Sequence, residues 1–511
     1  MFTSLAAGTV AVMSPMCLFL IVVGVAVGIV FGSIPGLSAT MAIALFLPVS
    51  YTLQPLEGMT LLISLYIGGV SGGLISAILL KMPGTPSSVA TCFDGYPMTQ
   101  KGEAIKALGT GVFFSFLGTL ISILALIFIA PNLATAALRF GHFEYFAIAV
   151  FSLTMIASLS SGSMLKGLLA GIFGMGCASV GMAPIDAVSR FHFGSMQLSA
   201  GLDILPVLIG MFALSEIMAN AEVSRVEGRA TVLSVSIKGT KGFGFSGREF
   251  KSQIFNMFRS AAIGLGIGIL PGLGGSTSNL LAYSVAKNQS KYPEKFGTGI
   301  IDGVVATETA NNASIGGAMI PLLTLGIPGD MATAMLLGGL MIHGLTPGPL
   351  LFAEEPVLIY GIFSAMLLAN FAMLIEEFFG LRFFVRMLRT PKYILMPIIF
   401  VLCIVGAFGL NSRVFDTYIV IAFGIVGYAF IKLKLPVAPF IMGFILGPMV
   451  ESYFRRALML SKGDYSPFVT KPISGVFLAI AVLSLLLTLR RNYLVWKRRN
   501  NTAAETAVTA C

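Results

Sequence analysis

Charged residues are scarce in this sequence. Only 11% of its 511 residues are Asp, Glu, Lys or Arg, whereas 56% are hydrophobic. A soluble domain usually carries about 25% charged residues, and a water-soluble chain of this size could not cover its surface with so few. The composition therefore excludes a soluble globular protein and indicates that the lipid bilayer is the solvent.

Residues that bind metals or form disulfide bonds are also few. The chain has three histidines and five cysteines, with no CxxC pair and no two histidines at ligand spacing. Such a distribution predicts neither a disulfide framework nor a metal site. The charge of +10 comes from residues gathered in loops and near the C-terminus, which is typical of membrane proteins and does not indicate nucleic-acid binding.

The first part of the chain lacks basic residues altogether. No Lys or Arg precedes Lys81, so we expect no cleaved signal peptide and an N-terminus outside the cytoplasm. The stretch 222–252 and the tail 490–511 are basic by contrast. We predict that both lie in the cytoplasm, the first as a linker between two membrane halves, 1–221 and 253–489.

Long apolar runs occupy most of the remaining chain. A helix needs about 20 apolar residues to cross the hydrocarbon core, and the alternation of a membrane β-barrel is absent. The sequence therefore predicts an all-α polytopic protein with roughly 11 to 14 membrane segments, one run being long enough for two broken segments. The runs are 12–32, 59–80, 107–131, 142–158, 165–183, 201–221, 253–270, 309–342, 350–381, 393–409, 415–433, 436–450 and 473–489.

Two motifs occur once in each half, which indicates an internal repeat. GSIPGLSAT at 32–40 matches GILPGLGGST at 268–277, with an offset of 236 between the two prolines. SGGLISAILLKMPGTPSS at 71–88 matches SIGGAMIPLLTLGIPGD at 314–330, with an offset of 245. The difference fits a polar insertion near 287–295. Opposite entry sides of the two halves favour inverted repeats, and a parallel duplication is the alternative.

Each of these motifs interrupts an apolar run with Pro-Gly. Proline and glycine break helices, and broken half-helices aim free amides at an anion. Paired interruptions in two related halves are therefore typical of a transporter's binding site. The alternative is a set of helix kinks whose hydroxyls bond back to the preceding turn.

These interruptions supply most of the predicted site residues. For Lys81 the alternative is an interfacial lysine, and for Asp330 it is the N-cap of the following helix, which we favour. The predicted substrate-binding residues at the interruptions are Ser33, Pro35, Gly36, Ser38, Lys81, Pro83, Gly84, Thr85, Ser87, Pro271, Gly272, Gly274, Gly275, Ser276, Pro328 and Gly329, and the predicted cation-binding residues are Thr40, Thr277, Glu308 and Asp330.

A polar segment, ATETANNASIGG, precedes a long apolar run at 306–317. Uncharged amides and hydroxyls beside one carboxylate suit a cation or a substrate carboxylate, and a carboxylate in lipid costs about 2.5–3.5 kcal/mol on insertion scales. We therefore predict that Asn311 and Asn312 bind substrate near Glu308. The alternative is an interfacial loop. Two further acidic features, Asp94 and the pair Glu376–Glu377, receive no predicted role.

Taken in this order, the motifs resemble the TctA-type large membrane subunit of the tripartite tricarboxylate transporters. The residues that carry the resemblance are GSIPGLSATMAIALFLP, SGGLISAILLKMPGTPSSVATCFDGYPM, GILPGLGGSTSN, ETANNASIGGAMIPLLTLGIPGD and GLTPGPLLF, between about Gly32 and Pro448.

The resemblance implies a permease of the bacterial inner membrane, and in that membrane an N-terminus outside the cytoplasm lies in the periplasm. Such permeases act with a small four-helix TctB-type membrane subunit and a periplasmic TctC-type solute-binding protein. They import citrate or related carboxylates, driven by a gradient of Na+ or H+, without another cofactor. The layout is similar to that of elevator-type transporters with re-entrant hairpins.

Other functions remain open alternatives on the sequence. A membrane enzyme acting on a lipid-linked substrate would need clustered acids or metal ligands, and the sequence shows neither pattern. A permease that docks an ATPase is compatible with the loops, although the chain has no GxxxxGK[ST] loop of its own. A passive channel is disfavoured because Lys81 and Gly326 differ at matching positions of the two motifs.

Overall fold

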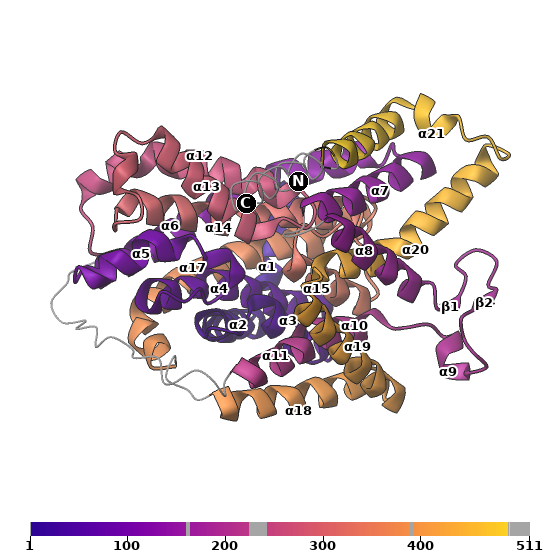
Figure 1. The fold of residues 1–511 in the computed structure, drawn as a ribbon, viewed down its shortest axis with the longest axis horizontal. Coiled ribbons are helices and arrows are strands. Elements are labelled where there is room, and N and C mark those ends of the chain that lie inside the picture. Colours follow the sequence, from indigo (N-terminus) through magenta and orange to yellow (C-terminus); the bar gives the residue numbers. More distant parts are fainter. Residues whose placement is uncertain (1, 160–163, 224–242, 388–391, 489, 491–511) are drawn as a thin grey trace, which may run out of the picture. The chain divides into compact units, whose positions relative to one another are not determined.

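The computed structural model describes residues 2–159, 164–223, 243–387, 392–488 and 490. Almost all of them are helical (Figure 1). Seven helices of this described part are long and apolar enough to cross a membrane, and shorter apolar helices such as Ala39–Tyr51, Met164–Ala178 and Met331–Ile342 accompany them. The prediction of an all-α polytopic membrane protein is confirmed, and the tail 491–511 lies outside the described residues.

The chain forms two compact units. The first comprises Met1–Arg139 and Leu202–Leu433, and the second comprises Phe140–Gly201 and Lys434–Cys511. Neither coincides with a predicted sequence half, and the two-half division remains a prediction about internal similarity. The helices of the first unit are α1 (Phe2–Val12), α2 (Pro15–Ser33), α3 (Ala39–Tyr51), α4 (Pro55–Leu80), η1 (Pro86–Ser88), α5 (Thr91–Gln100), α6 (Ala104–Ala137), α10 (Ile204–Leu208), η2 (Ile209–Leu214), α11 (Ser215–Val223), α12 (Gly247–Ile269), α13 (Gly274–Gln289), η3 (Pro293–Lys295), α14 (Ile301–Leu325), α15 (Met331–Ile342), α16 (Leu351–Glu354), α17 (Pro356–Met387), α18 (Lys392–Asn411) and α19 (Val414–Leu433).

The same series of elements occurs twice in the first unit. α2, a Pro-Gly turn, α3 and α4 are followed by a left-handed residue, Lys81, and α12, a Pro-Gly turn, α13 and α14 are followed by a left-handed residue, Gly326. The connection between the second and third helices is longer in the second series, 290–300 against 52–54, as the offset of the motifs predicts. The run 309–342 is divided between α14 and α15, as expected.

The helix contacts of the two series also correspond. α2 packs on α4, and α12 packs on α14; the three helices α2, α3 and α4 lie together in indigo in Figure 1. Small residues let such backbones approach closely. Gly28, Gly32 and Gly72 abut the carbonyl oxygens of Leu65, Gly69 and Ile29, and Gly264, Gly268 and Gly317 abut those of Ala310, Ser314 and Leu265. Each pair in the second series matches a pair in the first at the sequence offsets of the two motifs.

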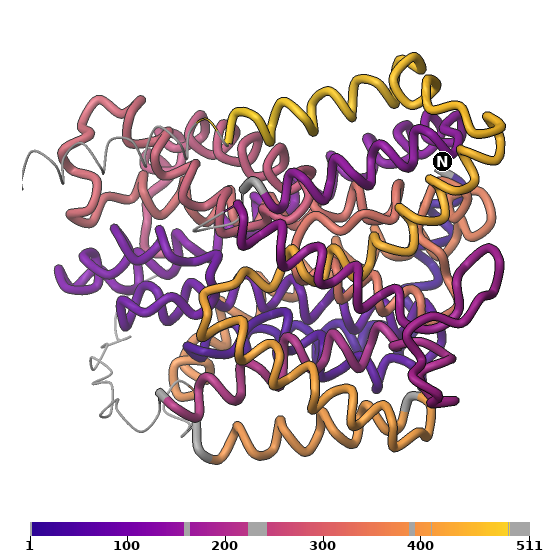
Figure 2. The backbone as a smooth tube through the Cα atoms, turned by 45° about the vertical axis from the view of Figure 1, so that its right-hand side comes forward, coloured from indigo at the N-terminus to yellow at the C-terminus, as the bar shows by residue number. Residues whose placement is uncertain are grey.

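The second unit is built from α7 (His142–Leu159), α8 (Met164–Ala178), α20 (Val437–Leu460) and α21 (Pro467–Thr470). Phe143, Ala457 and Phe468 form its buried aromatic cluster, and Figure 2 shows the yellow C-terminal helices running beside α7. A two-stranded hairpin, β1 (Gly181–Met182) and β2 (Ser189–Arg190), follows α8, with α9 (Met196–Ser199) after it. A cavity of about 420 Å³ lies between α7, α8, α20 and the hairpin.

Candidate functional site

The first interruption separates α2 from α3. Ser38 caps α3 by accepting a hydrogen bond of 3.1 Å from the amide of Met41, because its extended backbone leaves the hydroxyl facing the first turn. Gly36 has a φ of 92°, a conformation that favours glycine. The Ser33 hydroxyl donates to the carbonyl of Val30 in the preceding turn at 3.0 Å. For Ser33 the structure therefore shows the alternative interpretation, in which the hydroxyl bonds back to its own helix.

Helix α11 covers this first interruption with two residues that the sequence analysis did not single out. Asn220 donates to the carbonyl of Gly36 at 2.7 Å, and Ser38 donates to the carboxylate of Glu216 at 3.3 Å. The π-helical turn η2 lies directly before α11, and such turns are frequent at functional sites. In the sequence, Glu216 stands out only as an acidic residue near the end of the apolar run 201–221.

The two interruptions of the second half meet each other. The amide of Gly272 donates to the carbonyl of Gly329 at 2.7 Å. A Cβ at Gly274 would come within 2.7 Å of the Cβ of Asp330, so only glycine fits at that contact. The interruptions at 271–275 and 328–330 therefore form one surface.

Asp330 is the N-cap of α15, as favoured from the sequence. Its carboxylate accepts a hydrogen bond from the amide of Thr333 at 2.7 Å, and its own amide donates to the Thr333 hydroxyl at 2.9 Å. The same carboxylate accepts a hydrogen bond of 2.6 Å from the hydroxyl of Tyr66 on α4. Asp330 thus connects the second half of the chain to α4 in the first half.

The remaining interruption, at 81–88, packs on the first half. A Cβ at Gly84 would lie 2.1 Å from the carbonyl oxygen of Gly32, so this turn touches the end of α2. Thr85 and Ser87 share a hydrogen bond of 2.9 Å between their hydroxyls. Lys81 is exposed, has a φ of 58° as the C-cap of α4 and lies 5.8 Å from the ring centre of Tyr96.

One point brings the two halves together. A Cβ at Gly275 would lie 2.4 Å from the Oδ1 atom of Asn311, 2.9 Å from the Cβ of Ser87 and 3.3 Å from the hydroxyl of Ser314. These residues belong to three separate segments of the first unit, η1, α13 and α14. We call the group Ser87, Gly275, Asn311 and Ser314 the tip cluster.

Asn311 is the residue of the tip cluster with unused hydrogen-bonding capacity. Its side chain is fully buried, and within the described part of the chain neither polar atom of its amide has a hydrogen-bond partner of normal geometry. Buried amides are rarely left in this state because desolvation without a partner costs about 1–3 kcal/mol. An unsatisfied donor and acceptor pair at this point suits a polar ligand.

The polar segment 307–314 lies inside α14 and is buried, so the interfacial-loop alternative is wrong. The Glu308 carboxylate accepts hydrogen bonds from the hydroxyls of Thr91 and Ser115, the latter at 3.1 Å, and lies 3.4 Å from the amide nitrogen of Asn312. Asn279 in turn donates to the Thr91 hydroxyl at 3.3 Å. Within the described residues, every hydrogen bond to this carboxylate comes from an uncharged group.

A second buried acid, Glu377 on α17, lies near Glu308. Its Oε2 atom accepts a hydrogen bond of 2.8 Å from the hydroxyl of Ser71, and its Oε1 atom has no hydrogen-bond partner among the described residues. The two carboxylates are close enough to interact electrostatically. Glu377 received no predicted role because the sequence of two adjacent glutamates does not show which of the two side chains turns inward.

The other predicted residues lie around these contacts. Thr40 and Pro328 are buried, Ser276 and Thr277 are half-buried at the start of α13, and Pro83 is exposed. Pro35, Pro271 and Gly36 form the turns themselves. The structure thus brings together the four interruptions and α14, whereas Lys81 stands apart on an exposed turn.

The Tripartite tricarboxylate transporter TctA family model matches residues 18–442. The chain belongs to this family. It is therefore the multi-pass membrane permease subunit of a tripartite tricarboxylate transporter, and a transporter family fits the absence of predicted catalytic residues. All four interruptions and α14 lie within the matched residues.

Two relatives of this TctA-family chain come from Agrobacterium vitis. An "Uncharacterized 52.8 kDa protein in TAR-I ttuC' 3'region" is 36% identical over 489 residues, which are 96% of each chain. An "Uncharacterized protein in TAR-II ttuC' 3'region" is 39% identical over 223 residues, which are 44% of this chain and 92% of the relative. No solved structure matches the chain.

Proposed function

We propose that this TctA-family permease imports tricarboxylates or related small carboxylates across the bacterial inner membrane, driven by a gradient of Na+ or H+. A periplasmic solute-binding protein delivers the substrate, and a small four-helix membrane subunit completes the transporter. The observation that carries the proposal is the tip cluster, where interruptions from both halves meet beside an unsatisfied buried amide.

The start of α13 is the proposed carboxylate-binding element. α13 begins with Gly274 and Gly275 and has no side-chain cap, whereas Ser38 caps α3 and Asp330 caps α15. The free amides of an uncapped first turn carry the positive end of the helix dipole and favour an anion. The Asn311 amide beside Gly275 adds a neutral donor.

The Glu308 group is the proposed cation-binding element. A buried carboxylate without a cationic neighbour is costly unless a proton or a metal cation neutralises it. The hydroxyl oxygens of Thr91 and Ser115 lie beside the Glu308 carboxylate, and hydroxyl and carboxylate oxygens suit a hard cation such as Na+. The amide nitrogen of Asn312 lies 3.4 Å from the same carboxylate. Asn311 lies one residue from Asn312, so the proposed anion and cation positions are neighbours on α14.

Movement of one part of the chain against another would expose this site alternately to each side. Inverted repeats with broken helices commonly work in this way. The elevator layout, the N-terminus in the periplasm and the C-terminus in the cytoplasm belong to the same proposal.

Uptake into proteoliposomes tests the proposal. Vesicles holding this chain with its small membrane subunit would receive radiolabelled citrate and purified solute-binding protein outside, under an imposed Na+ gradient or, separately, a pH gradient. We expect saturable uptake that requires the binding protein and one of the gradients. Absence of uptake across citrate, dicarboxylates and aromatic acids, with all three proteins folded, would contradict the proposed function.

A further inference from the structure

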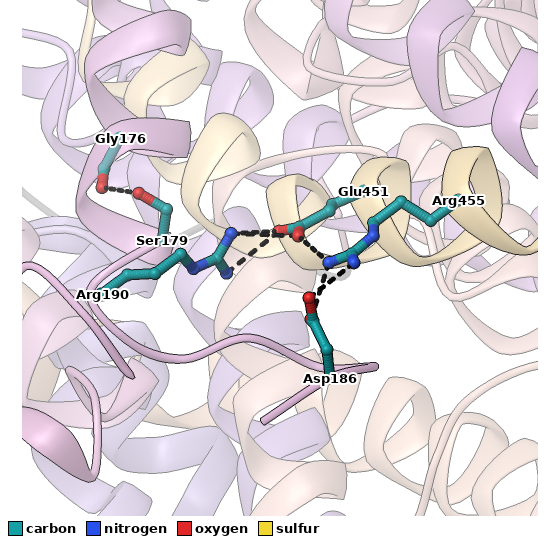
Figure 3. Close-up of polar contacts among 6 residues, drawn as sticks. All are labelled: Gly176, Ser179, Asp186, Arg190, Glu451 and Arg455. Carbon is teal, nitrogen blue, oxygen red and sulfur yellow. Dashed lines mark hydrogen bonds and ion pairs between the residues drawn. The ribbon is translucent and has the colours of Figure 1, made fainter. Parts of the chain in front are cut away.

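The β1–β2 hairpin of the second unit holds its charges against α20. Asp186 accepts two hydrogen bonds of 2.8 Å from the guanidinium of Arg455. Arg190 binds Glu451 at 3.0 and 3.1 Å, and Arg455 also reaches Glu451 at 3.2 Å (Figure 3). Paired Arg–carboxylate bonds of this kind fix the relative geometry of the two segments. The four charges therefore neutralise one another on the α20 side of the hairpin.

Large apolar side chains are exposed on the same hairpin and on the turn that follows it. The exposed fractions are 57% for Met182, 56% for Val188, 58% for Phe191, 86% for Phe193 and 90% for Met196. A hairpin surrounded by water places its apolar side chains inward and its charges outward. Here the large apolar side chains are exposed while the charges are paired with α20, and an exposed apolar patch of this kind indicates apolar surroundings.

The backbone maintains the exposed rings at a local cost. Phe191 has a φ of 51° and Phe193 a φ of 46°, a left-handed conformation that is uncommon for bulky residues. Such conformations persist where the surrounding structure imposes them, often at binding surfaces. Phe191 directly follows Arg190, whose ion pair with Glu451 holds the chain at that point.

The apolar surface continues from the helix before the hairpin. Leu165, Leu169, Ile172 and Phe173 of α8 are 64%, 54%, 63% and 48% exposed, and their spacing places them on one helical face. α8 is an apolar helix of a membrane protein, so lipid is the natural cover for this face. The hairpin begins three residues after α8 ends and extends the same surface.

We propose that residues 181–199 form an interfacial anchor, in which Phe191, Phe193 and Met196 enter the headgroup region of the bilayer. The partner is the lipid surface, and the ion pairs to α20 hold the charged side chains away from it. Aromatic side chains are enriched at membrane–water interfaces. This anchor would hold the second unit at the membrane surface whether or not substrate is bound.

Tryptophan fluorescence tests the anchor, because the sequence has a single tryptophan. Replacing it (Trp496→Phe) and introducing Phe193→Trp gives one reporter on the hairpin. Tyr465→Trp in the same background is the matched control, since Tyr465 is 63% exposed in a polar loop of the same unit. Both proteins are reconstituted in phosphatidylcholine vesicles with bromine at known depths of the acyl chains.

We expect brominated lipid to quench the Phe193→Trp reporter several-fold more than the control, most strongly with bromine near the headgroup. Quenching by aqueous acrylamide alone would overturn the proposal. Shielding from both quenchers that appears only with the small membrane subunit would also overturn it, because a protein would then cover the hairpin. Phe191→Trp provides a second reporter if Phe193→Trp does not fold.

Discussion

At the scale of single residues, Asp94 is a buried carboxylate with a structural role that its sequence position concealed. It lies within α5 and is 1% exposed. Its carboxylate accepts hydrogen bonds from the amides of Gly297, Gly299 and Ile300 at 2.8–3.1 Å and from the hydroxyl of Tyr283 at 2.9 Å. Asp94 thereby fixes the connection that leads into α14.

The substitution Asp94→Asn should destabilise the permease by about 1.5–3 kcal/mol, because hydrogen bonds to a charged group are lost. Tyr283→Phe, which removes one of the four bonds, should cost only about 1 kcal/mol. Thermal unfolding in detergent measures both. Equal midpoints for the two variants would show that the carboxylate charge is not important here.

Gly275 is the residue at which the tip cluster tolerates the least change. A methyl group there would lie 2.9 Å from the Cβ of Ser87, which cannot rotate away because it is attached to the backbone. We expect Gly275→Ala to reduce citrate uptake at least about tenfold, since misplacement of a binding group by 1 Å has effects of that order or larger. Gly266→Ala on α12, where nothing lies within 4 Å, should transport normally; equal losses in both variants would contradict the tip cluster.

At the scale of elements, α4 and α14 end in the same way although their sequences differ. Lys81 and Gly326 occupy matching positions, and both are left-handed C-caps. Glycine adopts this conformation without strain, whereas another residue incurs a cost of about 1–2 kcal/mol. A backbone role therefore accounts for position 81 without contact between its side chain and substrate.

Lys81→Gly separates the backbone role from the charge. We expect this variant to retain at least about half of the uptake and to be more thermally stable, because the left-handed strain is relieved. Lys81→Arg is the matched variant that keeps the charge. Loss of uptake in Lys81→Gly together with normal uptake in Lys81→Arg would show that substrate needs the cation.

At the scale of the whole molecule, the proposed energy coupling rests on two buried acids from distant parts of the chain. Glu308 lies on α14 and Glu377 on α17, and neither has a cationic hydrogen-bond partner within the described residues. Two nearby carboxylates that are both buried cannot both stay charged without a bound proton or cation. Glu377 is therefore expected to contribute to the energy coupling of the cycle.

Glu377→Gln should keep the shape of the side chain while removing its charge. We expect gradient-driven accumulation to fall at least about tenfold, as is typical when an intramembrane charge is functional, while exchange of substrate across the membrane persists. Counterflow and accumulation assays on the same vesicles measure the two separately. Unchanged accumulation would exclude Glu377 from coupling, and Asn370→Ala, on the same helix, controls for helix packing.

The sequence by itself determined the membrane class, the broken helices and the repeated motifs. Scarce charge and long apolar runs decide the solvent, and Pro-Gly ends a helix wherever it occurs. The split of 309–342 into two helices, the Asp330 cap and an insertion near 287–295, where the structure has the long connection 290–300, were all visible in this local pattern.

Only the tertiary structure decided which of these features meet. The contact of Gly275 with Ser87 and Asn311 joins segments far apart in the chain, and no local pattern encodes such a meeting. The burial of α14 and the inward turn of Glu377 depend on which helices pack around them. Local sequence fixes where a helix starts, breaks and ends, whereas packing of distant helices decides which polar groups lose water and become available to a ligand.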